Sequence, residues 1–343
     1  MADTRRPRRD RRTVLPANPN KEEKPNLIPH ELVRDFERQM KAMRIGDTPL
    51  KRLQKIERLL GTRRLHVKLE GENPTGTHKD RMALLLTLSA RKAGYDTIAA
   101  ATCGNYGASL LRVCDKLGVQ CRIFIPTEFE GSRSAEILDA GGKIVPVQGV
   151  YENAIATCEK ECAANRWYNA NPGGKNNELG IYAYTFIAKE IAQALGKQPD
   201  WVSVPVGNGT ILAGIWQGFQ SMGMKPRMLG TSNNNAAVRG MVMGREAPVA
   251  VQDMTLTHVN DPLAGNYLPD AEDAIRAMID SKGQGMEISD EEMVEAAKML
   301  LAEEGLDILP ASASALAGIQ RLETKTHTFV LVATARGNPS AVR

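Results

Sequence analysis

The sequence predicts an α/β protein of two lobes, each built on a mostly parallel sheet that is flanked by helices. The chain has 343 residues, more than one small hydrophobic core usually organises. From about residue 30, short apolar runs alternate with amphipathic stretches, which is the pattern of βαβ units. The hydrophobic share of 42% is typical of a globular protein, and no run reaches about 18 apolar residues, so no membrane span is expected.

The first series of elements follows this alternation directly. Apolar runs bounded by turn residues predict strands, and amphipathic stretches closed by glycine predict helices. The predicted strands are 65–70, 96–102, 120–126 and 143–149, and the predicted helices are 79–93, 108–117, 132–141 and 152–166. Gly94 and Gly118 end two of these helices, because glycine accepts the left-handed conformation of a helix C-terminus.

A second series has the same alternation and leads to the C-terminus. The predicted helices are 178–196, a loop and helix at 207–223, and 289–305; the predicted strands are 200–206, 227–232 and 327–334. Ser289 and Glu292 form a capping box at the start of the last helix, and Gly305 terminates it. The region 233–285 has few periodic signals, and no element is predicted there.

The cysteines and histidines indicate neither a disulfide framework nor a metal site. Five cysteines at irregular spacing favour a reducing compartment, and we expect a cytoplasmic protein. Cys158 and Cys162 are four residues apart on a predicted helix, and the five histidines are scattered without metal-binding spacing. No metal is therefore expected. A serine hydrolase is also not expected, because the chain lacks the GxSxG elbow.

The N-terminus is strongly basic. Six arginines lie between residues 5 and 12, and a Pro/Asn/Lys-rich stretch follows them. We interpret residues 1–29 as a disordered, solvated basic arm; a tail for nucleic acid or an acidic partner, or a weak targeting signal, are the alternatives. Without the arginine run at residues 5–12 the remaining chain is slightly acidic, so nucleic-acid binding is not expected.

The segment ENPTGTHKDRMA, residues 72–83, carries the first candidate for chemistry. Thr77 is predicted as the N-cap of the following helix, which puts Lys79 in the first turn. The positive end of the helix dipole disfavours a cation there, so the neutral amine is favoured. A neutral lysine amine can attack a carbonyl group and form a Schiff base. The alternative is an ordinary surface lysine.

The segment PVGNGTILAG, residues 205–214, is a candidate anion site. Gly207 and Gly209 allow backbone amides to approach a ligand, and a helix begins near Ile211. A dinucleotide loop fits poorly, because Leu212 replaces the third glycine of GxGxxG and the next strand ends without an acid. A phosphate monoester is a better candidate ligand than a dinucleotide. The alternative is an ordinary βα turn.

Two further segments end strands with small polar residues. In AATCGNYGAS the polar residues Thr102, Cys103, Asn105 and Tyr106 follow a strand, and in VLVATARGNP Thr334 does so. Open α/β sheets bind ligands at the carboxyl ends of their strands. Either segment alone is weak support for a site.

Taken in order, these four segments resemble those of the fold-type II pyridoxal-phosphate enzymes, and most closely the threonine synthase branch of the tryptophan synthase β superfamily. ENPTGTHKDR is similar to the NPTGSFKDR-like lysine signature, TCGNYGAS to the asparagine loop, PVGNGTILAG to the phosphate loop, and ATARGNP to the end of the last strand. The run DILPASASALAG, residues 307–318, is also similar to a family landmark. The resemblance spans about residues 45 to 340.

The resemblance implies a role for each matched residue. Lys79 would form the internal aldimine with pyridoxal 5'-phosphate and, once displaced by substrate, would act as general base. Asn105 would bind the phenolic oxygen of the cofactor, and Thr334 would meet the pyridine nitrogen. The phosphate would be held by Gly207, Asn208, Gly209 and Thr210, and the substrate would be bound by Thr102, Cys103, Gly104, Tyr106 and Lys175.

The sequence departs from the family pattern at two places that bear on the substrate. His78 replaces a common phenylalanine, as in the tryptophan synthase β chain, and would either donate to the cofactor phosphate or only pack behind the aldimine. Threonine synthases have an NPYR-like run whose arginine helps to bind the substrate phosphate. Here the run is NPGGKNNELG, so only Lys175 could substitute. A lysine lacks the bidentate fork of arginine.

The motifs also indicate domains and a reaction. Residues 30–75 plus 166–343 would form the large phosphate-binding domain, residues 76–165 the small domain with the asparagine loop, and the ligand would lie in the cleft between them. The resemblance implies a homodimer. It favours conversion of O-phosphohomoserine and water to threonine and phosphate. β-Replacement on O-phosphoserine or activated serine, a serine/threonine dehydratase, and a binding protein on a decayed scaffold are the alternatives.

Overall fold

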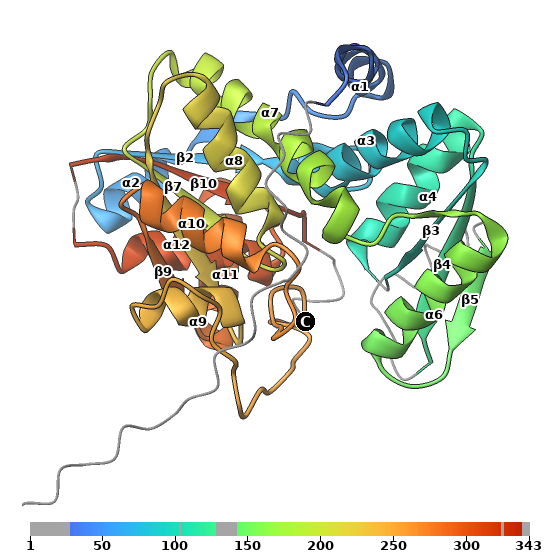
Figure 1. Ribbon diagram of the computed structural model, residues 1–343. Coiled ribbons are helices and arrows are strands. Elements are labelled where there is room, and N and C mark those ends of the chain that lie inside the picture. Colours follow the sequence, from blue (N-terminus) through green and yellow to red (C-terminus); the bar gives the residue numbers. More distant parts are fainter. Residues whose placement is uncertain (1–27, 103, 128–142, 324–325, 338–343) are drawn as a thin grey trace, which may run out of the picture.

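The computed structural model describes residues 28–102, 104–127, 143–323 and 326–337. Residues 1–27 of the expected basic arm, Cys103 and the predicted helix at 132–141 lie outside the described residues. Figure 1 shows two lobes, each with a sheet that is flanked by helices. The predicted α/β class with mostly parallel sheets is confirmed.

The larger sheet has six strands in the order β1-β2-β10-β7-β8-β9. The strands are β1 Leu50–Arg52, β2 Arg64–Leu69, β7 Trp201–Pro205, β8 Arg227–Ser232, β9 Gln284–Glu287 and β10 Thr328–Ala333. Only β1 is antiparallel to its neighbour, and the other pairs are parallel. Every residue of β7 and β10 is buried, which explains their continuous apolar runs.

The smaller sheet has four parallel strands in the order β5-β4-β3-β6. They are β3 Thr97–Ala101, β4 Gln120–Pro126, β5 Lys143–Val147 and β6 Tyr168–Asn169. The last of these pairs with Ile98 and Ala99 of β3, so this sheet reaches residue 169. The domain boundary expected at residue 165 therefore leaves β6 outside the small domain. The expected boundary comes too early because β6 is too short to be recognised as a strand from the sequence.

Helices cover both sheets (Figure 1). They are α1 His30–Met43, α2 Gln54–Leu60, α3 Lys79–Lys92, α4 Asn105–Leu117, α6 Tyr151–Asn165, α7 Asn177–Leu195, α8 Thr210–Ser221, α9 Ala236–Val242, α10 Ala271–Asp280, α11 Asp290–Glu304 and α12 Pro310–Gln320. The capping box of α11 is present: Ser289 Oγ accepts from Glu292 N at 3.3 Å, and Glu292 Oε2 accepts from Ser289 N at 2.8 Å.

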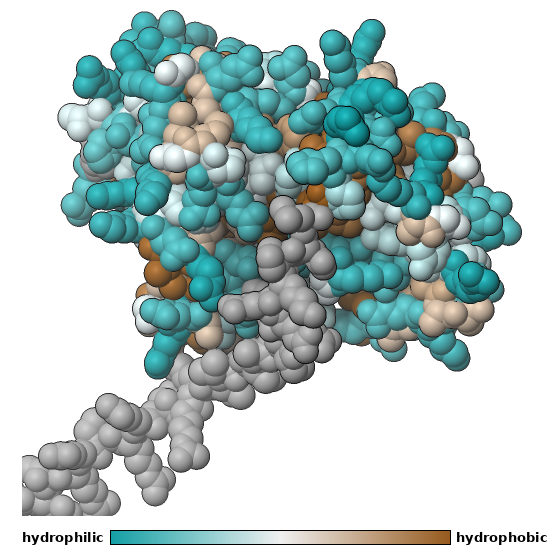
Figure 2. All heavy atoms as spheres, turned by 45° about the horizontal axis from the view of Figure 1, so that its top comes forward, coloured by the Kyte–Doolittle hydropathy of each residue, from teal (hydrophilic) through white to brown (hydrophobic). Residues whose placement is uncertain are grey.

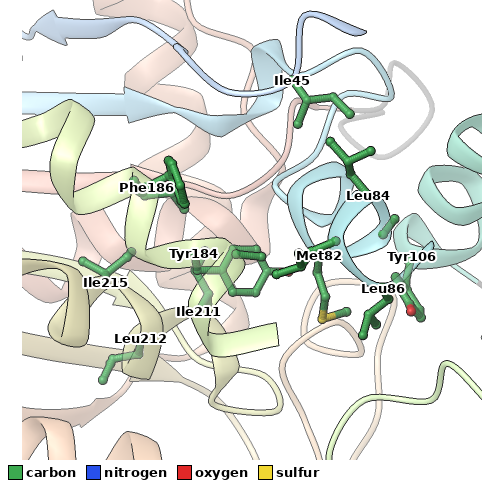
Figure 3. Packing of buried hydrophobic residues seen from close by; sticks show 14 of the residues in the cluster. Ile45, Met82, Leu84, Leu86, Tyr106, Tyr184, Phe186, Ile211, Leu212 and Ile215 are labelled. Carbon is green, nitrogen blue, oxygen red and sulfur yellow. The ribbon is translucent and has the colours of Figure 1, made fainter. Parts of the chain in front are cut away.

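The two lobes share one hydrophobic core around α3, α7 and α8. Met82 of α3, Tyr184 of α7 and Ile211 of α8 belong to a single buried cluster, and they lie close together in Figure 3. The same cluster includes Ile98 of the small sheet and Val202 of the large sheet. The helix that begins with Lys79 is therefore packed at the junction of the lobes.

Hydrophilic residues cover most of the face shown in Figure 2, and hydrophobic residues show mainly near its middle. Within the described ranges, no helix has both the length and the apolar character needed to cross a membrane.

Candidate functional site

Lys79 is the first residue of α3 and is half-buried. The N-cap is His78 rather than the expected Thr77, and Thr77 Oγ1 instead accepts a long hydrogen bond of 3.4 Å from Lys79 N. The turn before the helix is fixed by Asp80, whose carboxylate accepts from Thr75 N at 2.9 Å and from Thr75 Oγ1 at 2.5 Å. This turn therefore presents Lys79 from a rigid support.

A buried ion cluster anchors α3 two residues further on. The Arg81 guanidinium, fully buried, donates to both oxygens of Glu70 at 2.8 Å, and to Glu190 at 2.7 and 2.8 Å. Lys68 also donates to Glu190, at 2.5 Å, so two acids face two bases. Although burial opposes ionisation, Arg81 and Lys68 lower the pKa of Glu190 to about 2. The cluster joins the end of β2 to both α3 and α7.

The environment of Lys79 favours its neutral amine. Burial lowers the pKa of Lys79 to about 8, and the charge of Asp270 opposes part of this shift. An amine with this pKa is about one-tenth unprotonated at pH 7, a far larger neutral fraction than that of an ordinary lysine. The alternative of an ordinary surface lysine does not fit this environment. Burial rather than the helix dipole is the main cause of the lowered pKa.

The loop before α8 presents unpaired backbone amides. Within the described part of the chain, the N–H groups of Gly209, Thr210 and Ile211 have no hydrogen-bond acceptor. Gly209 has φ +100°, and a Cβ there would lie 2.4 Å from the carbonyl oxygen of Asp270. Only glycine fits this position. Free amides at a helix start form an anion site.

Asp270 connects this loop to Lys79. Its backbone N donates to Asn208 O at 3.1 Å, and its carboxylate accepts from Thr210 Oγ1 at 2.5 Å. The same carboxylate is close enough to Lys79 to raise the pKa of the amine. The structure therefore brings the predicted lysine and the predicted phosphate loop together.

Thr334 lies immediately behind Lys79. Its carbonyl oxygen accepts from His78 N at 2.9 Å, and Thr77 forms a β-bridge with Ala335. The Thr334 hydroxyl lies 2.7 Å from Ser312 Oγ at the start of α12. These contacts bring the end of β10 to the Lys79 turn.

The structure corrects the expectation that His78 could donate to a cofactor phosphate. Its Nδ1 is 3.0 Å from the carbonyl oxygen of Thr334, and a carbonyl only accepts, so Nδ1 carries the hydrogen. Burial lowers the pKa of His78 well below its usual range, so the ring is neutral and Nε2 is an acceptor. The centroid of the ring lies 5.3 Å from that of Tyr184.

The hydroxyl groups of Ser312 and Thr334 form a short chain of hydrogen bonds. Ala335 N donates to Ser312 Oγ at 3.1 Å, and Thr334 Oγ1 is the only acceptor near the Ser312 hydroxyl hydrogen among the described residues. If Ser312 donates to Thr334, the hydroxyl hydrogen of Thr334 remains free for an acceptor in the site. An aromatic ring nitrogen without a proton is such an acceptor.

Replacing Ser312 by alanine is expected to lower the free energy of unfolding by about 1–2 kcal/mol, because Ala335 N–H loses its acceptor. It should also weaken cofactor binding about 3–10-fold, since the Thr334 hydroxyl is no longer oriented. Ser314→Ala is the matched control: its hydroxyl is also buried, but donates to Ala311 O at 2.7 Å. Equal cofactor affinity in the two variants, measured by fluorescence titration, would contradict this role.

The asparagine loop lies beside the same turn. Asn105 is the first residue of α4, and α4 is joined to the Lys79 turn by a 3.0 Å contact between Ser109 Oγ and Thr75 Oγ1. Thr102 is buried, and its hydroxyl lies 3.5 Å from the N of Gly104, the N-cap of α4.

Tyr106 and Lys175 do not contribute to this site as expected. Tyr106 is buried, and its hydroxyl donates to Ala170 O at 2.7 Å inside the small lobe. The Lys175 ammonium lies 4.8 Å from the ring centroid of Tyr168. It lines a groove with Tyr95 and Cys162, at the amino end of β3, whereas the site lies at the carboxyl end. The sequence does not show the direction of either side chain.

Sequence reasoning missed three residues at the site: Asp270, Asn177 and Ser312. Asp270 and Asn177 meet across α10 and α7, where Asn177 Nδ2 donates to Asp270 Oδ1 at 2.6 Å. The only signal for Ser312 was its place in the family landmark DILPASASALAG. No local pattern indicated Asp270.

Two mostly parallel sheets joined around a half-buried lysine, with free helix amides nearby, are features of an α/β enzyme that binds a phosphorylated cofactor. The family described as "Pyridoxal-phosphate dependent enzyme" matches residues 41–334, and the chain belongs to this family.

The relatives support the expected branch of the family. Threonine synthase from Methanocaldococcus jannaschii is 31% identical over 288 residues, covering 81% of this chain and 70% of that protein. Threonine synthase from Bacillus sp. (strain ULM1) is 30% identical over 305 residues, covering 85% and 83%. A solved threonine deaminase from T.th. has a TM-score of 0.76 at 21% identity and covers 91% of this chain and 98% of that one; this shows the fold.

The side chains present fit pyridoxal phosphate. An aldehyde needs a neutral amine, and Lys79 has a pKa of about 8. A phosphate needs donors, and the amides at the start of α8 are free among the described residues. A ring nitrogen needs a polar partner, and the Thr334 hydroxyl lies beside the Lys79 turn.

Proposed function

We propose that the protein catalyses a threonine synthase-type reaction, in which O-phosphohomoserine and water are converted to threonine and phosphate. The observation that carries the proposal is the half-buried Lys79, with a pKa of about 8, at the junction of the lobes and beside the phosphate loop. Threonine synthases 30–31% identical over most of the chain support this reaction class. We also propose a homodimer in the cytoplasm; sedimentation analysis tests the oligomeric state.

Each residue has a distinct task in this proposal. The bound cofactor supplies the electron-withdrawing ring that makes the substrate Cα–H acidic. Lys79 holds the cofactor covalently and later takes the proton from the substrate Cα. Gly207, Asn208, Gly209 and Thr210 bind the phosphate, with Gly209 and Thr210 contributing free amides. Thr334 and Asn105 orient the ring at its nitrogen and its phenolic oxygen, and Thr102 and Gly104 would bind the substrate.

The position of Lys175 favours a second candidate, elimination or replacement on an activated serine or threonine. O-phosphohomoserine carries a distal phosphate, and Lys175 points into the groove at the other end of β3. At the neighbouring Gly174, a Cβ would meet no atom within 4 Å among the described residues. A shorter substrate does not need a cation there.

Phosphate or acetate release from a panel of substrates distinguishes the two candidates. We expect release from O-phosphohomoserine together with threonine formation. Turnover of O-phosphoserine, O-acetylserine or threonine, combined with no turnover of O-phosphohomoserine, would contradict the first candidate and support the second. Absence of turnover with all of them would favour a binding protein on an inactive scaffold.

Covalent attachment of the cofactor is expected to depend on pH through the Lys79 amine. The neutral fraction of an amine rises with pH, so the attachment rate should rise about tenfold per pH unit below about 8 and level off above it. Pyridoxal, which lacks the phosphate, is the suitable probe because its binding does not involve the anion site. A stopped-flow rate that still rises steeply above about pH 9.5 would indicate an ordinary lysine.

A further inference from the structure

Asp270 is a buried carboxylate placed at the start of α8. It is 1% exposed, and its two oxygens accept from Thr210 Oγ1 at 2.5 Å and from Asn177 Nδ2 at 2.6 Å. Its backbone is held against the phosphate loop by the bond to Asn208 O and by the close approach of Gly209. The carboxylate therefore cannot move away without disrupting the loop itself.

The contacts of Asp270 determine which groups at the start of α8 can donate a hydrogen bond to an anion. The hydroxyl hydrogen of Thr210 is committed to Asp270, so the Thr210 side chain has no hydrogen left to donate to a phosphate. The free amides of Gly209, Thr210 and Ile211 remain as donors among the described residues. A negative charge already lies beside them, and it repels a second anion.

The titratable groups that face Asp270 come from three helices. Lys79 of α3 attracts its charge, Asp273 of α10 repels it, and Tyr184 of α7 is a neutral neighbour whose pKa burial raises well above its usual range. Burial raises the pKa of Asp270, whereas hydrogen bonds from Thr210 and Asn177 and the charge of Lys79 lower it. The local charge thus depends on how Asp270 and Lys79 are protonated.

We propose that Asp270 is a positioning residue that sets the charge of the phosphate site. When ionised, Asp270 accepts the Thr210 hydroxyl hydrogen and attracts the Lys79 ammonium. Its negative charge also repels a dianion at the start of α8. When Asp270 takes up a proton, this repulsion is removed and the dianion binds to the amides. Phosphate binding is therefore linked to proton uptake. The proposal deepens the proposed function, because it rests on the assignment of this helix start as the cofactor-phosphate site.

Sulfate binding to the cofactor-free protein tests the proposal, because sulfate stays a dianion between pH 5.5 and 8 and so isolates the titration of the protein. We expect Asp270→Asn to bind sulfate at least about tenfold more tightly than the wild type at pH 8. The difference should shrink towards pH 5.5, where Asp270 of the wild type is more protonated. Isothermal titration calorimetry in two buffers of different ionisation enthalpy should show proton uptake in the wild type and less in Asp270→Asn.

Two controls separate this role from simple support of the loop. Asp273→Asn removes an equal charge three residues away and should change sulfate affinity less than about threefold. Lys79→Gln should keep most of the proton uptake if Asp270 is the group that titrates. Equal or weaker sulfate binding by Asp270→Asn at pH 8, or failure of both proteins to bind sulfate, overturns the proposal. The proposed function is tested separately by the absorbance of the attached cofactor, which does not involve sulfate.

Discussion

Lys79→Ala is expected to lose the absorbance band at about 410–420 nm that a cofactor attached to lysine produces. It should also lower kcat by at least about 1,000-fold, because the same amine acts as the general base. The physical reason is that this half-buried amine has a pKa of about 8 and lies beside the phosphate loop. Spectra of the purified variant, followed by single-turnover assays with excess cofactor, measure both effects.

Lys92→Ala is the matched control for this variant. Lys92 is the last residue of the same helix, is 42% exposed, and pairs with Glu31 on the surface. Its removal should leave the band and kcat within about twofold of the wild type, since exposed ion pairs contribute little. If Lys79→Ala retained both the band and the activity, the assignment of the amine would be wrong.

Arg81→Met is expected to have the largest effect on stability. Removal of one partner from a buried ion cluster costs about 3–5 kcal/mol, because the remaining charges are left without compensation. Here the two carboxylates of Glu70 and Glu190 would face each other with Lys68 as their only nearby base among the described residues. For a chain of this size we expect the apparent Tm to fall by roughly 5–15 °C.

The control for Arg81 is Arg38→Met. Arg38 pairs with Asp35 on the surface of α1, with 71% and 47% of the two side chains exposed. Its removal should cost at most about 1 kcal/mol and shift the apparent Tm by no more than about 2 °C. A similar Tm in both variants would show that the buried cluster does not stabilise the junction between α3 and α7. Differential scanning fluorimetry of the cofactor-free proteins makes the comparison.

Most elements of the fold could be predicted, because the longer strands combine an apolar run with flanking turn residues. Among the helices that were missed, α12 has no polar face. Every residue from Pro310 to Ile319 in α12 is buried, so its small residues show no polar face. The region 233–285 contains α9 and α10, which are short, and β9, which is half-buried throughout.

The site could be predicted only where its residues are local. Lys79, the phosphate loop and Thr334 lie in short segments with their own turn or helix-start signal. The contacts of Asp270 join residues 60 and 93 positions apart, to Thr210 and Asn177, and no periodicity reveals such distances. For Lys175, the position in the sequence suggested a substrate-binding residue. Its side chain instead lies over the Tyr168 ring, and the sequence does not show this direction.

The most direct test of the central claim is to reduce the cofactor-loaded protein with borohydride, digest it and identify the modified peptide by mass spectrometry. The account predicts that the added mass of the reduced cofactor is found on the peptide containing Lys79, and that it is absent when Lys79 is alanine. Modification at a different lysine, or no stable modification at all, would contradict the claim that this amine carries the cofactor.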